Sequence, residues 1–129
     1  MQQEIIGLIH SSVGNSDEPF YQLVNEFYSG VAQDPTLRPL YPEDLTEPKR
    51  HLALFLIQRC GGPTTYSDER GHPRMRGRHM PFKIGVKERD AWIANMFAAI
   101  DKVPELAPFR QPLREYFAEF ATFMINQPG

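Results

Sequence analysis

The stretch from Arg70 to Lys87 carries the residue types best suited to bind a charged cofactor. It contains no acidic residue, and its basic and histidine residues are Arg70, His72, Arg74, Arg76, Arg78, His79, Lys83 and Lys87. Residues four apart share a face of a helix, so Met75 and His79 would lie together, and Phe82 follows just beyond the helix end. We therefore expect His79 on the apolar side of a short helix whose other side is basic.

This arrangement suits a planar cofactor that is apolar at its centre and anionic at one edge. An imidazole on an apolar wall can coordinate a metal through one ring nitrogen, and nearby arginines can pair with carboxylates. Haem combines a central iron, an apolar macrocycle and propionates on one edge. The rest of the chain offers no Cys/His set for zinc and no glutamate-rich di-iron pattern. The pattern makes haem a candidate cofactor, with His79 as its iron ligand.

Other interpretations fit the same residues. His79 could be a histidine whose hydrogen bonds are satisfied within the core. The arginines could form a solvated face, or the strip 70–87 could serve a small helical anion- or RNA-binding module. The formal net charge of −2 and the placement of the aromatic residues on apolar stripes argue against RNA. A third alternative is an interaction domain that shares the fold but binds no haem.

Helical spacing dominates the chain before the basic stretch. Apolar residues recur at steps of three and four over residues 20–31, which is typical of an amphipathic helix. Ser16 or Asp17 can cap this helix, and the Asp34-Pro35 pair ends it. The first ten residues are expected to form one further short helix.

A second helix is expected after the corner at Leu40-Tyr41. Thr46 is its expected cap, Pro48 lies in its first turn, and Gly61-Gly62-Pro63 stops it. Its apolar face carries Leu52, Phe55 and Leu56.

The second half of the chain alternates irregular and helical segments. Residues 64–71 show no apolar periodicity and are expected to form a long loop, a kind of segment that is often functional. A short helix is expected between Pro73 and Pro81, and a longer one over about 86–102. A last helix carries Leu113, Phe117, Phe120 and Met124. The sequence thus predicts an all-α fold with five or six helices of unequal length.

The bulk properties limit the class of protein. A chain of 129 residues with 41% hydrophobic residues suits one domain over 1–129, with residues 1–15 as an N-terminal extension or short helix. A single cysteine, Cys60, excludes an internal disulfide. No apolar run is long enough to span a membrane, and the N-terminus lacks the features of a signal peptide. We expect a soluble cytoplasmic protein that binds neither nucleic acid nor membrane.

Across residues 20–102 the sequence resembles the group II truncated haemoglobins. The segments that carry the resemblance are Phe27-Tyr28, Leu40-Tyr41-Pro42-Glu43-Asp44, Gly61-Gly62-Pro63, Thr65-Tyr66-Ser67, Arg70-Gly71-His72-Pro73-Arg74-Met75-Arg76, Arg78-His79-Met80-Pro81-Phe82 and Asp90-Ala91-Trp92. The resemblance implies a truncated globin fold, a two-over-two helical sandwich around b-type haem.

The resemblance also implies roles for individual residues. His79 falls on the proximal iron ligand, and the expected distal pocket consists of Tyr28, Tyr41, Trp92, Leu52 and Pro48. The residues expected to contact haem are Phe55, Leu56, Tyr66, Arg78, His51, Arg70, Met75 and Phe82. Of these, Tyr66 and Arg78 are favoured as propionate contacts, with His51 and Arg70 as further candidates. Departures from the family pattern occur in the N-terminal stretch, at Arg59-Cys60 and at His51.

The implied function is reversible binding of dioxygen and other diatomic gases. Dioxygen on ferrous iron is partly anionic, and a hydrogen bond to a charged acceptor contributes about 1.5–3 kcal/mol. The hydroxyls of Tyr28 and Tyr41 and the indole N–H of Trp92 would therefore slow its release. Slow release favours sensing or redox chemistry, such as oxidation of nitric oxide or reduction of peroxide, over oxygen transport. Such chemistry needs a reductase in another chain, and assembly into a homo-oligomer stays open.

Overall fold

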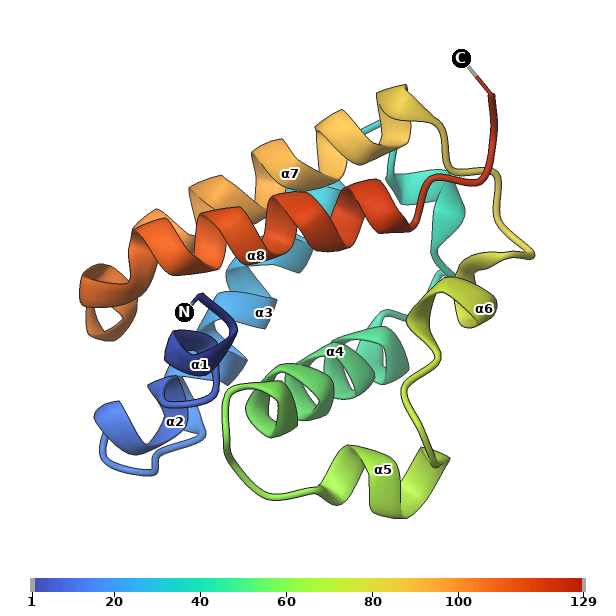
Figure 1. The fold of residues 1–129 in the computed structure, drawn as a ribbon. Helices are drawn as coiled ribbons and strands as arrows, with labels where there is room; N and C mark the ends of the chain where they lie inside the picture. Colours follow the sequence, from blue (N-terminus) through green and yellow to red (C-terminus); the bar gives the residue numbers. More distant parts are fainter. Residues whose placement is uncertain (1, 129) are drawn as a thin grey trace.

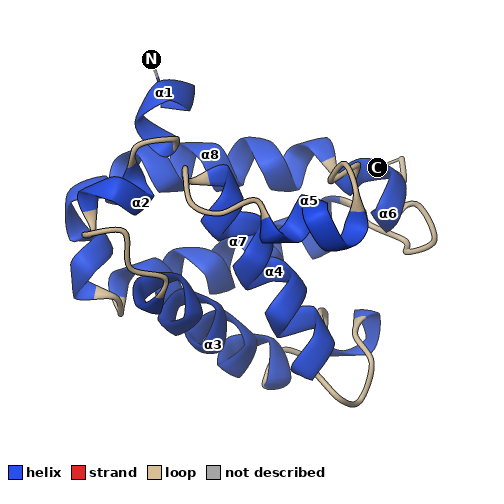
Figure 2. Ribbon diagram, turned by 90° about the horizontal axis from the view of Figure 1, so that it is seen from below, coloured by secondary structure: helices blue, strands red, loops and turns tan. Residues whose placement is uncertain are grey.

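The computed structural model describes residues 2–128 as helices joined by loops, with no strand in that range (Figures 1 and 2). The α-helices are α1 (Gln2–Ile6), α2 (Ile9–Ser12), α3 (Glu18–Ala32), α4 (Thr46–Arg59), α5 (Thr65–Arg70), α6 (Met75–His79), α7 (Val86–Asp101) and α8 (Arg110–Phe123). Two 3₁₀ helices, η1 (Arg38–Leu40) and η2 (Pro104–Phe109), join them. The predicted all-α class is confirmed.

Four long helices form two packed pairs. Helix α3 packs against α4 and α7, and α7 runs beside α8 (Figure 1). The apolar stripe predicted for α3 is buried along its length, as are Met96 and Ile100 of α7 and Phe117 of α8. Burying one such side chain contributes about 1.5–3 kcal/mol, so these faces hold the pairs together. The arrangement is the expected two-over-two sandwich.

The region before α3 is more ordered than a simple extension. It contains two short helices where one was expected, and Ile6 and Ile9 are fully buried. His10 is also buried, and its Nε2 lies 2.8 Å from Oδ1 of Asp17. The backbone N–H of His10 donates to the carbonyl of Cys60 at 2.9 Å, which joins this region to the end of α4.

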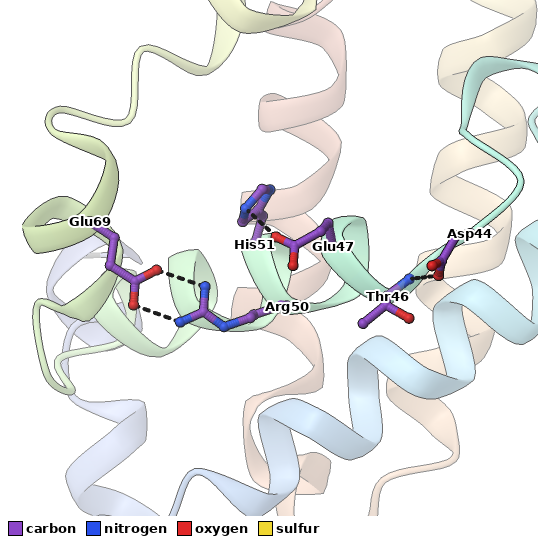
Figure 3. A network of polar contacts seen from close by, with 6 residues as sticks. All are labelled: Asp44, Thr46, Glu47, Arg50, His51 and Glu69. Atoms are coloured by element: carbon purple, nitrogen blue, oxygen red, sulfur yellow. Dashed lines mark hydrogen bonds and ion pairs between the residues drawn. The ribbon is translucent and has the colours of Figure 1, made fainter.

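The start of α4 corrects one sequence-based expectation. Thr46 is the first helical residue and not the cap, because Leu45 occupies the cap position. Oδ1 of Asp44 accepts a hydrogen bond from the backbone N–H of Thr46 at 2.9 Å (Figure 3). The capping chemistry therefore comes from an aspartate two residues earlier than expected.

The predicted loop over 64–71 is wrong, since residues Thr65–Arg70 form helix α5. The guanidinium of Arg50 holds α5 to α4 by donating to both carboxylate oxygens of Glu69 at 2.7 and 2.6 Å (Figure 3). The side chain of Gln58 adds two further bonds to Ser67. Because α5 buries a single aromatic side chain, Tyr66, it leaves no apolar periodicity in the sequence. Tertiary contacts stabilise a helix too short to form alone.

No helix within residues 2–128 has the length and apolar character needed to cross a membrane.

Candidate cofactor pocket

A cavity of about 350 Å³ lies among α3, α4, α6, α7 and α8 and collects most of the predicted site residues. Its lining includes Tyr28, Tyr41, Pro48, His51, Leu52, Phe55, Tyr66, Arg70, Met75, Arg78, His79, Phe82 and Trp92. The size is that of a small-molecule site. The residues come from separate segments of the chain, so folding alone brings them together.

Leu56 is the predicted contact that does not line the cavity. It is buried in the core with 2% exposure. Pro48, His51, Leu52 and Phe55 recur at helical spacing and make the cavity face of α4. Each residue turns the helix by about 100°, which carries Leu56 from that face into the packing behind it.

His79 is oriented by its own helix. Its Nδ1 lies 2.6 Å from the carbonyl oxygen of Met75, one turn earlier in α6. A carbonyl only accepts, so Nδ1 carries the proton and Nε2 keeps a free lone pair. Nε2 itself has no hydrogen-bond partner within residues 2–128. The ring of Phe82 lies 6.4 Å away, centre to centre. This imidazole can therefore bind a metal in the cavity.

Two hydrogen-bond donors meet at the hydroxyl of Tyr41. The indole N–H of Trp92 and the hydroxyl of Tyr28 both bond to it. The rings of Tyr28 and Tyr41 meet edge to face at 5.4 Å. Burial raises the pKa of Tyr28 above its usual range, and burial raises the pKa of Tyr41 to about 12 against the opposing effect of these bonds. Both phenols therefore stay protonated at neutral pH.

The sequence analysis missed the residue that shapes the corner at Tyr41. The guanidinium of Arg38 donates to the carbonyls of Tyr41, Pro42 and Glu43 at 3.2, 3.0 and 3.0 Å. These bonds fix the backbone that presents the Tyr41 side chain to the cavity. An arginine next to Pro39 and just before this corner was the available signal.

The basic strip does not form one continuous surface. Nε of Arg78 donates to the carbonyl of Pro73 at 2.7 Å, and Nη2 donates to the carbonyl of Arg70 at 2.9 Å. The guanidinium groups of Arg70 and Arg78 also lie over the ring of Tyr66, at 5.7 and 6.0 Å. Arg76 instead reaches the carbonyl of Phe123 at 3.1 Å. These three side chains therefore do not share one direction.

His51 lies at the rim of the cavity and already has a protein partner. Its Nε2 is 3.2 Å from Oε2 of Glu47, one turn earlier on α4 (Figure 3). Burial and the positive charge of Arg70 lower the pKa of His51 below its usual value. At neutral pH it is therefore a neutral hydrogen-bonding group rather than a cation.

The C-terminal part of the chain supplies apolar wall residues that the sequence analysis did not assign to the site. Phe120 and Ala121 of α8 and Met124 beyond it line the cavity. Leu37, Leu40 and Ile84 add to the wall. The apolar stripe of the last helix was visible in the sequence, but nothing in it indicated which cavity the stripe faces.

The donor set fits haem. No group of three or more histidine, cysteine, aspartate or glutamate side chains able to hold a metal ion occurs in the described part of the chain. The cavity instead offers one imidazole nitrogen, largely apolar walls and the cationic groups of Arg70 and Arg78. Such a site suits a metal that brings its own planar ligand with acidic substituents.

The comparisons with known proteins agree with this geometry. Residues 9–126 match the bacterial-like globin family. The group 2 truncated haemoglobin YjbI of Bacillus subtilis (strain 168) is 42% identical over 111 residues, which cover 86% of this chain and 84% of that protein. The chain belongs to the group II truncated haemoglobins. The family resemblance predicted from the sequence is thus confirmed.

Solved structures of truncated haemoglobins and other bacterial haemoglobins share the fold. The thermostable haemoglobin of Thermobifida fusca superposes with a TM-score of 0.89 at 47% identity, covering 95% of this chain and 99% of that one. The truncated oxygen-avid haemoglobin of Bacillus subtilis gives a TM-score of 0.85 at 39% identity, covering 92% and 99%. The predicted two-over-two globin fold is confirmed.

Proposed function

We propose that this chain is a b-type haem protein that binds dioxygen reversibly and releases it slowly. The observation that carries the proposal is the free Nε2 of His79 in an apolar cavity that also contains the Tyr28–Tyr41–Trp92 cluster. A relative of 39% identity is described as oxygen-avid, which supports the same assignment. When bound, haem would supply a ferrous iron with a coordination position for a diatomic gas.

The chain's own residues would hold that cofactor and its ligand. The bond from Nδ1 to the carbonyl of Met75 orients the ring of His79 and leaves Nε2 to be offered to the iron. Arg70 and Arg78 lie beside Tyr66 at the cavity wall, where they can meet propionates through charge-assisted hydrogen bonds. His51 would give a propionate the one N–H that it now directs to Glu47, and Met75 and Phe82 would pack on the macrocycle.

Tyr41 is the distal donor whose own O–H is not already donated to another side chain of the cluster. Its oxygen accepts from both Tyr28 and Trp92, so its own O–H proton remains to be donated into the cavity. The two incoming bonds make that proton a stronger donor by polarising the hydroxyl. A partly anionic dioxygen would be held there, whereas Pro48 and Leu52 offer no donor.

Slow release suits redox chemistry more than delivery. A protein that retains dioxygen can pass it to nitric oxide or take part in peroxide reduction, with a reductase in another chain returning the iron to the ferrous state. We propose that the primary function is to bind dioxygen and that the haem protein then takes part in these reactions.

The test of the proposal is axial ligation by His79. Purified wild-type protein is expected to show a Soret band and to bind dioxygen and carbon monoxide when reduced. The His79→Gly variant should lose the proximal ligand, and added imidazole should restore the ferrous spectrum by filling the space that the side chain leaves. His72→Gly, at an exposed histidine of the same strip, is the matched control and should behave as wild type. An unaltered ferrous spectrum in His79→Gly would overturn the assignment.

A further inference from the structure

The chain after α8 passes beside the loop that follows α6 (Figure 1). We call residues 80–85 the proximal loop, since they follow directly after His79, and residues 123–127 the C-terminal clasp. In the sequence the two segments lie about forty residues apart. In the fold they are joined by a set of hydrogen bonds centred on Asn126, a residue with no part in the cavity wall.

The side-chain amide of Asn126 bridges three backbone groups. Its Oδ1 accepts from the N–H of Ile84 at 2.9 Å. Its Nδ2 donates to the carbonyl of Phe82 at 2.8 Å and to that of His79 at 3.2 Å. Both amide N–H groups and the amide oxygen are therefore used. No other side chain in the described part of the chain touches the carbonyl of His79 in this way.

The backbone of the clasp adds to this connection. The N–H groups of Asn126 and Gln127 both point to the carbonyl of Ile84, at 2.8 and 3.2 Å. Nε and Nη2 of Arg76, within α6, donate to the carbonyls of Phe123 and Ile125 at 3.1 and 3.4 Å. The clasp thus contacts α6 at its second residue, Arg76, and the loop beyond its end.

Helix α6 needs such external support. It has five residues, and helices this short are not stable by themselves in water. It begins next to Arg74, whose φ of 45° places a non-glycine residue in the left-handed region, at a cost in free energy. The proximal loop exposes Met80 and Phe82 and buries only Ile84, so it gains little from burial.

We infer that Asn126 is a positioning residue for the axial ligand, which rests on the proposed role of His79. By holding the carbonyl of His79, Asn126 fixes the backbone from which the imidazole projects. The bond from Nδ1 to the carbonyl of Met75 then sets the rotation of the ring. Asn126 touches neither the cavity nor the iron position, so it acts through His79. Groups that orient a metal ligand in this way affect metal retention strongly.

The experiment compares haem-loaded wild type with Asn126→Ala. The readouts are the iron–histidine stretching frequency of the ferrous protein, measured by resonance Raman spectroscopy, and the rate of haem transfer to an acceptor apoprotein. The variant is expected to shift or broaden the iron–histidine band and to lose haem about tenfold faster. A wild-type band and transfer rate in the variant would overturn the inference.

Asn95→Ala is the matched control. The side chain of Asn95 also links two segments, since its Nδ2 donates to Oδ2 of Asp34 and to the carbonyl of Ala91, both at 2.9 Å. It lies in α7, away from the proximal loop. This variant should lower thermal stability without moving the iron–histidine band, and an equal shift in both variants would overturn a role specific to Asn126.

A second variant keeps the test decisive if Asn126→Ala does not fold. Asn126→Asp retains an acceptor for the N–H of Ile84 but places a carboxylate against the carbonyls of His79 and Phe82. The same shift in the band is expected, and an unchanged band would overturn the inference. If wild type itself shows no iron–histidine band, the proposed function is wrong. If wild type shows the band and both Asn126 variants show the same band unchanged, only this inference is refuted.

Discussion

At the scale of single residues, the proposed oxygen binding depends on one oxygen atom of the distal side. The hydroxyl of Tyr41 receives hydrogen bonds from Tyr28 and Trp92, which belong to α3 and α7. Burial keeps both phenols protonated, so the cluster offers donors throughout the physiological pH range. This arrangement makes Tyr41 the direct donor in our proposal and gives Tyr28 and Trp92 supporting positions.

The distal cluster yields a prediction for ligand release. Tyr41→Phe, Tyr28→Phe and Trp92→Phe should each release dioxygen faster, by about tenfold where a bond of about 1.5 kcal/mol is lost. Carbon monoxide release should change little, because bound carbon monoxide carries less charge. Tyr41→Phe should have the largest effect, since it removes the proton that is free to reach the ligand. Stopped-flow measurement of both gases provides the comparison.

The double variant Tyr28→Phe with Trp92→Phe adds a further check. Both side chains bond to the same atom of Tyr41, so their effects on oxygen release should not add. Equal acceleration of dioxygen and carbon monoxide release would mean that these residues control access to the cavity, and the donor role would have to be abandoned.

At the scale of elements, the end of α4 meets the N-terminal region very closely. Gly61 follows α4 with a φ of 99°, and a Cβ at this position would collide with the carbonyl oxygen of Gly7. Glycine is therefore required twice, once for the backbone conformation and once for space. This close approach lets the short helices α1 and α2 dock on the rest of the fold.

Gly61→Ala is expected to destabilise the protein by about 3 kcal/mol or more, since strain and collision add. Gly14→Ala is the matched control, because Gly14 has a φ of 76° but no atom within 4 Å of an added Cβ. Its cost should be only the conformational one, about 1–2 kcal/mol. Urea denaturation of both variants measures the difference. Equal costs would show that the N-terminal region moves aside freely.

At the scale of the whole molecule, the core contains several weak acids that must stay neutral. Burial raises the pKa of Tyr41, Tyr116 and Cys60 to about 12 in each case, and that of Tyr28 further. In the unfolded chain, cysteine ionises near pH 8.5 and tyrosine near pH 10. The unfolded state therefore releases protons first as pH rises.

Below about pH 8, these groups should therefore leave the free energy of unfolding unchanged. As pH rises from about 9 towards 12, the free energy of unfolding should fall. Tyr116→Phe and Cys60→Ala each remove one such group, so each should make the decline shallower. Urea denaturation at a series of pH values from 7 to 11 measures the slope. A variant slope as steep as that of wild type would contradict the assignment of that group.

The sequence by itself determined the features that are local along the chain. The periodicity over residues 20–31 predicted α3, and the spacing of Met75 and His79 predicted that they share one side of a helix. The resemblance carried by ordered segments predicted the globin fold. These features could be read because helical faces and family motifs depend on residues a few positions apart.

Only the tertiary structure decided which distant residues meet. It formed α5 through contacts with α4, turned Leu56 away from the cavity, and brought Tyr28 and Trp92 to one hydroxyl. It also placed Asn126 on the carbonyl of His79. Contacts between segments tens of residues apart follow from how helices pack and where loops run, and neither periodicity nor local propensity records that packing.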